Sequence, residues 1–153
     1  MSPEERLAEL GLTLPDVVPP LAAYVPAVRT GSLVYVSGQL PMVNGALGET
    51  GQVGSDVTPE AARVMAQHCA LNALAAVKAE IGDLALVTRV VKVVGFVASA
   101  PGFSGQPQVV NGASDLLLAL FGDAGRHARS AVGVVSLPMN TPVEVELIVE
   151  VAD

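Results

Sequence analysis

The chain has little of what usually stabilises a small domain: one cysteine, Cys69, no tryptophan, and an aromatic content of only 3% among 153 residues. A single cysteine excludes an intrachain disulfide, so nothing indicates an oxidising compartment. With so few rings, the core has to be built from Val, Leu, Ala and Ile. The length is enough for one packed domain and too short for two ordinary ones, so we expect a single domain over residues 1–153.

Basic residues are also scarce, with eight Lys and Arg against fifteen Asp and Glu and a formal net charge of -7. Nucleic acids and anionic membranes are bound through clustered Lys and Arg that neutralise phosphate. Here the basic residues are scattered, and only Arg126 and Arg129 lie close together. We therefore expect neither a nucleic-acid partner nor a membrane partner.

Long hydrophobic runs are missing too. No run approaches the ~20 apolar residues that span a bilayer, and the opening Ser2-Pro3-Glu4-Glu5 does not resemble a basic, apolar signal peptide, so a cytoplasmic location is expected. Even so, 51% of the residues are hydrophobic and the mean hydropathy is +0.54. A small domain cannot bury that much apolar surface alone. The composition therefore predicts an oligomer with an apolar interface.

Three helices are predicted from their start signals and apolar periodicity. Ser2, with Pro and Glu behind it, is typical of a helix N-terminus, and Gly11 ends that helix; a Pro-containing extension follows to residue 20. Thr58-Pro59-Glu60 begins a second helix that runs to about Glu80. The third helix is expected over residues 109–121.

Strands are predicted over residues 25–29, 33–37, 87–98, 128–135 and 143–151, where β-branched residues are concentrated. A helix between consecutive strands is the crossover that a parallel pair requires, whereas short links suit antiparallel hairpins. The order helix, strand, strand, helix, strand, helix, strand, strand therefore predicts an α+β domain. Its mixed sheet should carry two main helices packed on one face.

The last predicted strand alternates strictly. Its odd positions, from Val143 to Val151, are apolar and should face the core. Its even positions place Glu144, Glu146 and Glu150 together on the other face. Adjacent carboxylates on one face repel each other unless water or cations separate them. Given the apolar surplus, we expect a neighbouring subunit to cover part of that face.

The preceding strand supplies a cation, Arg129, whose own face continues with the small residues Ala131 and Gly133. A guanidinium beside small residues can receive a carboxylate through two parallel hydrogen bonds. The alternative is a structural ion pair between Arg129 and Glu144 or Glu146. The residues by themselves leave both possibilities open.

Other candidate residues point to no additional chemistry. His68 and His127 have no second ligand at metal spacing, so no metal is predicted. Cys69 lies on an apolar helical stripe and is expected to be a buried core thiol. The glycine-rich residues 45–54 lack the Gly-Lys-Ser/Thr ending of a P-loop, and Ser37 is not in a Gly-x-Ser-x-Gly elbow.

Two segments carry a family resemblance. One runs from Tyr24 to Pro41 and contains Val36-Ser37-Gly38-Gln39-Leu40-Pro41; the other runs from Ala128-Arg129-Ser130 through Leu137-Pro138 to Val143-Glu144-Val145-Glu146. Together they resemble the reactive-intermediate deaminase (RidA, also called YjgF) family. The resemblance implies a chorismate-mutase-like α+β fold and a homotrimer around a central β-barrel, with a cleft at each subunit interface. The N-terminal helix would be an addition to that fold.

The resemblance also implies site residues. Arg129 matches the arginine that binds the substrate carboxylate, and Glu144 matches the acidic residue that positions or activates water. Tyr24, Ser37 and Asn111 match a tyrosine, a serine and an asparagine of the cleft.

The sequence departs from the family pattern at two positions near Arg129. Ala131 replaces the usual cysteine, although its backbone can still hydrogen-bond a ligand. Gly133 replaces a glutamate, which is expected to enlarge the pocket or admit water. The chain is also longer around residues 45–53 and 99–106, as in a divergent branch.

The implied activity is hydrolysis of 2-imino or 2-enamino acids to 2-oxo acids and ammonia, with no metal or organic cofactor. The alternative is a sensor that binds a small carboxylate metabolite without turnover, which the replacements at Ala131 and Gly133 keep open. A ribonuclease label is attached to some relatives. The acidic charge and scarce aromatics give it no physical support here.

Overall fold

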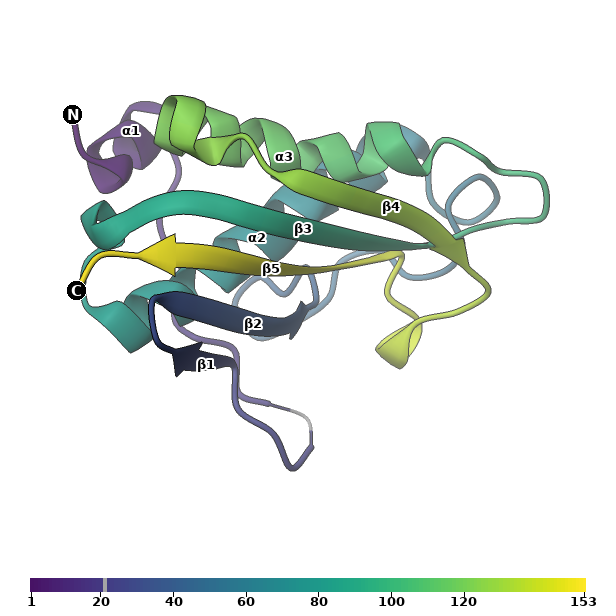
Figure 1. Ribbon diagram of the computed structural model, residues 1–153. Helices are drawn as coiled ribbons and strands as arrows, with labels where there is room; N and C mark the ends of the chain where they lie inside the picture. The colour runs from purple at the N-terminus through teal and green to yellow at the C-terminus, as the bar shows by residue number, and fades with distance from the viewer. Residues whose placement is uncertain (21) are drawn as a thin grey trace.

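The computed structural model describes residues 1–20 and 22–153. It shows a five-stranded mixed sheet with its two long helices behind it (Figure 1). The helices are α1 (Pro3–Glu9), α2 (Pro59–Ile81) and α3 (Gln106–Phe121), with 3-10 turns η1 (Leu84–Leu86), η2 (Gly122–Gly125) and η3 (Pro138–Asn140). The strands are β1 (Ala27–Thr30), β2 (Leu33–Gln39), β3 (Val87–Ala98), β4 (Ala128–Val134) and β5 (Val143–Val151).

The first helix begins where the sequence predicts. The Ser2 hydroxyl accepts a hydrogen bond from the Glu5 amide at 3.1 Å, and the Glu5 carboxylate accepts one from the Ser2 amide at 2.8 Å. This reciprocal capping satisfies two amides that a helix start leaves unpaired. An ion pair between Glu4 and Lys78 then ties α1 to α2.

The strand order is β1-β2-β5-β3-β4, which confirms part of the predicted topology and corrects the rest. The α3 crossover joins the parallel pair β3 and β4, as expected. The expected hairpin between the last two strands is wrong, because β5 is antiparallel to both β2 and β3. In this βαβ unit, β4 pairs with one edge of β3 and forms the outer strand of the sheet. The chain then crosses through η3, and β5 fills the position between β2 and β3.

The core lies between the sheet and the two helices. The odd positions of β5 are buried and the even positions are half-buried or exposed, as the alternation predicts. Gly95 of β3 shows how close the layers are, since a Cβ there would lie 2.4 Å from the Val110 side chain of α3. Cys69 is fully buried on α2, as predicted.

The two long helices meet at Gly112. A Cβ at this position would lie 1.9 Å from the backbone oxygen of Arg63 on α2, a contact that only helix displacement can relieve. We expect Gly112→Ala to lower the free energy of unfolding by about 1–3 kcal/mol, more than the ~1 kcal/mol that alanine gains in helix propensity. Urea denaturation measures this. Gly48→Ala is the control, because nothing lies within 4 Å of the added methyl group there. An unchanged midpoint for Gly112→Ala would mean that the helices can separate freely.

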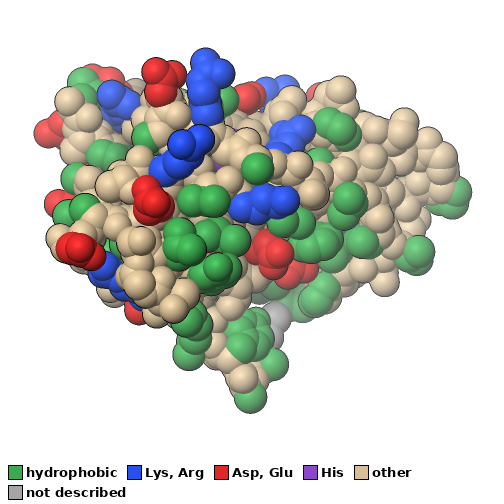
Figure 2. All heavy atoms as spheres, in the orientation of Figure 1, with side chains coloured by type: hydrophobic (Ala, Val, Ile, Leu, Met, Phe, Trp, Pro, Cys, Tyr) green, Lys and Arg blue, Asp and Glu red, His purple; other side chains and the backbone are tan. Residues whose placement is uncertain are grey.

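The face of the sheet opposite α2 and α3, here called the open face, is rich in apolar side chains. Val28, Tyr35 and Val132 are each more than 40% exposed. Figure 2 shows hydrophobic side chains gathered over the sheet with charged side chains among them. Lys92 and Glu146 help to line a cavity of about 120 Å³ on this face. Such a surface fits the predicted apolar interface.

Candidate functional site

Arg129 lies on β4 and points toward α3. Its strand partner is Val93, which is fully buried, so both side chains lie on the helix-covered face of the sheet. The Arg129 Nη1 donates to Asn111 Oδ1 at 2.7 Å and to Ser114 Oγ at 3.2 Å. These acceptors are three residues apart and therefore on one side of α3. Ala131 follows on the same face of β4.

The guanidinium has neutral partners. Among the described residues, no carboxylate lies within ion-pair distance of Arg129. Glu144 and Glu146 are on the open face, and β3 separates their strand from β4. The structural ion pair considered from the sequence is therefore not formed within the chain. The positive charge of Arg129 remains available to an anion.

Two side chains, Ser114 and His127, extend the hydrogen bonds of Arg129. Ser114 Oγ lies 2.8 Å from His127 Nε2, and His127 Nδ1 lies 2.6 Å from the carbonyl oxygen of Gly125. Sequence reasoning missed both residues as partners of Arg129. The available signals were the helical spacing of Ser114 from Asn111 and the position of His127 two residues before the arginine.

The space beside Gly133 is already filled. A Cβ there would lie 2.7 Å from Gln106 Nε2 and 3.0 Å from Ser99 Oγ. The Gln106 amide is fixed by donating to Ser99 Oγ at 3.1 Å and to the Phe103 carbonyl at 2.8 Å. The glycine therefore does not enlarge the pocket as expected. It makes room for a neutral amide at the position where the sequence resemblance implies a glutamate.

Glu144 belongs to a different group of residues, around a bulge in β2. The ladder between β2 and β5 shifts register between Val36 and Gln39. At that bulge the Glu144 carboxylate lies directly against the Gly38 backbone: a Cβ on Gly38 would be 2.0 Å from Glu144 Oε1. The close approach requires glycine at position 38.

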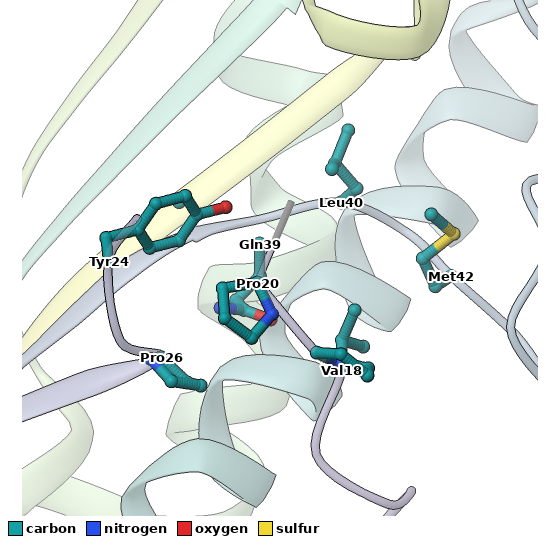
Figure 3. A pocket seen from close by; sticks show the side chains of 9 residues that line it. Val18, Pro20, Tyr24, Pro26, Gln39, Leu40 and Met42 are labelled. Atoms are coloured by element: carbon teal, nitrogen blue, oxygen red, sulfur yellow. The ribbon is translucent and has the colours of Figure 1, made fainter. Parts of the chain in front are cut away.

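Tyr24 and Ser37 lie at the same bulge. The Ser37 hydroxyl donates to the Val25 carbonyl at 2.6 Å, which holds the segment carrying Tyr24 beside β2. Tyr24 is 44% exposed and lines a small pocket with Gly38 and Gln39. Figure 3 shows its ring extending over this pocket with the hydroxyl at the far end.

The pKa of Glu144 is raised above the ordinary glutamate value, first because the carboxyl is partly buried and second because Glu146 repels its charge. A carboxyl with a raised pKa gives up its proton less readily and recovers it more easily near neutral pH. This property suits a group that accepts and returns a proton during a reaction.

The predicted site residues thus form two groups. Arg129, Asn111 and Ala131 lie at the β4 edge on the helix-covered face, whereas Tyr24, Ser37 and Glu144 lie at the β2 bulge. Two strands, β5 and β3, separate β2 from β4 (Figure 1). A single subunit does not bring the two groups together.

Cys69 is set apart from both groups by burial. Its thiol donates to the Val143 carbonyl at 3.7 Å, and burial, followed by the Glu144 charge, raises its pKa. We expect iodoacetamide at pH 8 to leave the folded protein unmodified, because the thiol is protonated and inaccessible. Mass spectrometry measures the adduct, and the same reagent in 8 M urea provides the control for reactivity, with complete modification expected. Rapid labelling of the folded protein would show that α2 opens easily.

Within residues 1–20 and 22–153, no group of three or more His, Cys, Asp or Glu side chains is placed to hold a metal ion. In the same part of the chain, none of the helices combines the length and apolar character needed to cross a bilayer.

Comparison with known proteins gives a consistent picture. A family model described as "YjgF/chorismate_mutase-like, putative endoribonuclease" matches residues 4–151. The chain is 46% identical to protein TCP17 of Trypanosoma cruzi over 148 residues, covering 95% of this chain and 91% of that protein. The crystal structure of Atu1372 from Agrobacterium tumefaciens, a protein of unknown function, shares 52% identity with a TM-score of 0.92, covering 98% of this chain and 92% of that one.

A second solved structure extends the similarity. It is the crystal structure of a protein described as a putative endoribonuclease from Shewanella oneidensis. It is 35% identical to this chain, covers 99% of this chain and 100% of its own, and superposes with a TM-score of 0.96.

Proposed function

The chain belongs to the YjgF/chorismate mutase-like family, and from that premise we propose that it hydrolyses 2-imino and 2-enamino acids to 2-oxo acids and ammonia. The reaction takes place in the cytoplasm, in clefts shared between the subunits of a homotrimer. The observation that carries the proposal is the pairing of two features: Arg129, which has no ion-pair partner among the described residues, lies in one group, and Glu144, a carboxyl with a raised pKa, lies in the other.

The homotrimer accounts for both the open face and the separation of the two groups. Packing the open faces around a common axis buries Val28, Tyr35 and Val132, which a monomer exposes to water. The β4 edge of one subunit then meets the β2 bulge of its neighbour. In this arrangement Arg129 and Glu144 enter the same cleft from different subunits, and their separation within one sheet supports the proposal.

The chemistry needs few groups. The carbon of an iminium ion is already electrophilic, so the protein has to hold the substrate, place a water molecule and move a proton. Arg129 binds the substrate carboxylate through paired hydrogen bonds. Glu144 accepts a proton from water as the oxygen attacks C2, and returns it to the nitrogen when the carbon–nitrogen bond breaks. Ammonia leaves, the hydroxyl group of the addition intermediate gives its proton to the Glu144 carboxylate or to water, and the carbonyl of the 2-oxo acid forms.

The remaining residues orient the reactants. Asn111 fixes the guanidinium from α3. Tyr24 and Ser37 lie next to Gly38 and Glu144, where their hydroxyl groups can hydrogen-bond the nitrogen or the attacking water. Ala131 offers backbone groups to the ligand without a thiol. No step requires a metal or an organic cofactor.

The test is ammonia release from 2-iminobutanoate generated in situ. We expect the protein to accelerate release over a protein-free reaction, and Arg129→Ala to abolish the acceleration.

Light scattering at micromolar concentration measures the assembly. A stable monomer would contradict the shared cleft. RNA in the same buffer should remain intact, because a net charge of -7 repels phosphate.

A sensor is the second candidate, favoured by the alanine and glycine at positions 131 and 133. In that case the cleft binds 2-oxo acids but does not accelerate ammonia release. Calorimetric titration with 2-oxobutanoate, run beside the ammonia assay, distinguishes the two: binding with acceleration supports the enzyme, and binding alone supports the sensor.

A further inference from the structure

We infer that His127, acting through Ser114, positions the Arg129 guanidinium so that its free edge faces the ligand carboxylate. This inference rests on the proposed function, in which Arg129 binds a 2-imino or 2-oxo acid. His127 itself does not touch the substrate. It is a positioning residue that reaches Arg129 through two successive hydrogen bonds, one between His127 and Ser114 and one between Ser114 and Arg129.

The hydrogen-bond directions follow from one carbonyl group. The Gly125 oxygen can only accept, so His127 Nδ1, 2.6 Å away, carries a proton and donates it. In the neutral ring, Nε2 is then an acceptor. Nε2 therefore accepts a hydrogen bond from the Ser114 hydroxyl, whose oxygen lies 2.8 Å away. With its proton so directed, Ser114 Oγ presents its lone pairs to Arg129.

Arg129 uses those lone pairs through a single nitrogen. Nη1 has two hydrogens, and its acceptors are Ser114 Oγ at 3.2 Å and Asn111 Oδ1 at 2.7 Å. Both hydrogens of Nη1 are thereby used. Among the described residues, none accepts a hydrogen bond from Nε or Nη2. These two nitrogens form the side of the guanidinium that binds a carboxylate with two parallel hydrogen bonds.

Burial makes the arrangement rigid. Ser114 is only 6% exposed on α3, and His127 is half-buried between η2 and β4. Without the imidazole acceptor, the Ser114 hydroxyl is free to rotate and point its proton toward Nη1, which repels the guanidinium. The planar group would then turn about its side-chain torsions, and the Nε and Nη2 hydrogens would no longer be aimed in a fixed direction.

The first measurement is the affinity for 2-oxobutanoate, a stable product that binds without turnover. We expect His127→Ala to weaken binding about tenfold, the effect of one oriented hydrogen bond. His127→Gln should restore most of it, because the amide oxygen can accept the Ser114 proton. His68→Ala on α2 is the control and should bind normally. Binding by His127→Ala within twofold of the parent overturns the inference, as does failure of the Gln variant to recover.

The second measurement does not depend on ligand binding. Imidazole ¹⁵N spectra should show His127 with a protonated Nδ1 and an unprotonated Nε2, and Arg129→Lys should shift the Nε2 signal in the ligand-free protein. The reverse tautomer, or a signal unaffected by Arg129→Lys, overturns the inference. If the parent binds no 2-oxo acid, the proposed function fails, and these spectra still decide whether His127 is coupled to Arg129.

Discussion

Replacing Glu144 with Gln should slow ammonia release by about 10²–10⁴-fold while assembly and 2-oxobutanoate binding are retained. The amide keeps the shape of the side chain against Gly38 but cannot accept a proton from water. Steady-state rates at saturating substrate measure the loss. Glu150→Gln, on the same strand and face but exposed, is the matched control and should turn over normally.

The same variant separates a catalytic role from a structural one through stability. Because the folded-state pKa of Glu144 is raised, the folded chain holds this proton more tightly than the unfolded chain does. The stability associated with this group therefore falls as pH rises from the unfolded pKa through the folded pKa. At pH 7.5, Glu144→Gln should melt no lower than the parent, and below pH ~4 the two should converge. A lower melting temperature at pH 7.5 would indicate that the charge balances a cation and stabilises the fold.

Arg129→Lys should weaken 2-oxobutanoate binding by about 10- to 100-fold, because an ammonium cannot form the paired fork. The fold should remain, since no ion pair within the described chain depends on this side chain. Arg126→Lys is the control: Arg126 is exposed beside Asp123 and takes no part in either group. Equal affinity in the Arg129→Lys protein would mean that the carboxylate binds elsewhere.

Mixing inactive subunits tests whether the cleft is shared. Arg129→Ala and Glu144→Gln chains are unfolded together in urea and refolded, so that the proposed homotrimer forms from mixed subunits. Each hybrid contains one interface in which Arg129 and Glu144 are both present, so equal mixing should recover roughly a quarter of the parent activity. A cleft contained within one subunit would recover none.

Local signals accounted for much of the fold. Ser2 and Thr58 cap helices as predicted, and the predicted bounds of the strands at residues 87–98 and 143–151 match β3 and β5. The predicted start of α3 at residue 109 is three residues late, because proline is tolerated in a first helical turn and Pro107 belongs to the helix. The strand order escaped prediction, since the choice of neighbour for β5 depends on long-range packing and not on the short link before it.

The site was predictable to a different degree. The resemblance implies Arg129 and Asn111 as site residues, and in the structure Arg129 Nη1 lies 2.7 Å from Asn111 Oδ1. Ser114 and His127 carried no motif, since a serine on a helix and a histidine before a strand occur in many folds. Their relation to Arg129 exists only once α3 and β4 are packed together. The same holds for Gln106, the first residue of α3, whose amide lies beside Gly133 but which the sequence shows only as the end of an insertion.

Because one residue group lies at the β4 edge and the other at the β2 bulge, activity should depend on protein concentration. If each cleft needs the β4 edge of one chain and the β2 bulge of another, an isolated chain has no complete cleft. Mass action then governs activity: below the dissociation range of the assembly, activity per milligram falls with each dilution and returns when the sample is concentrated again. An expression level too low for assembly would leave the cell with folded but inactive protein.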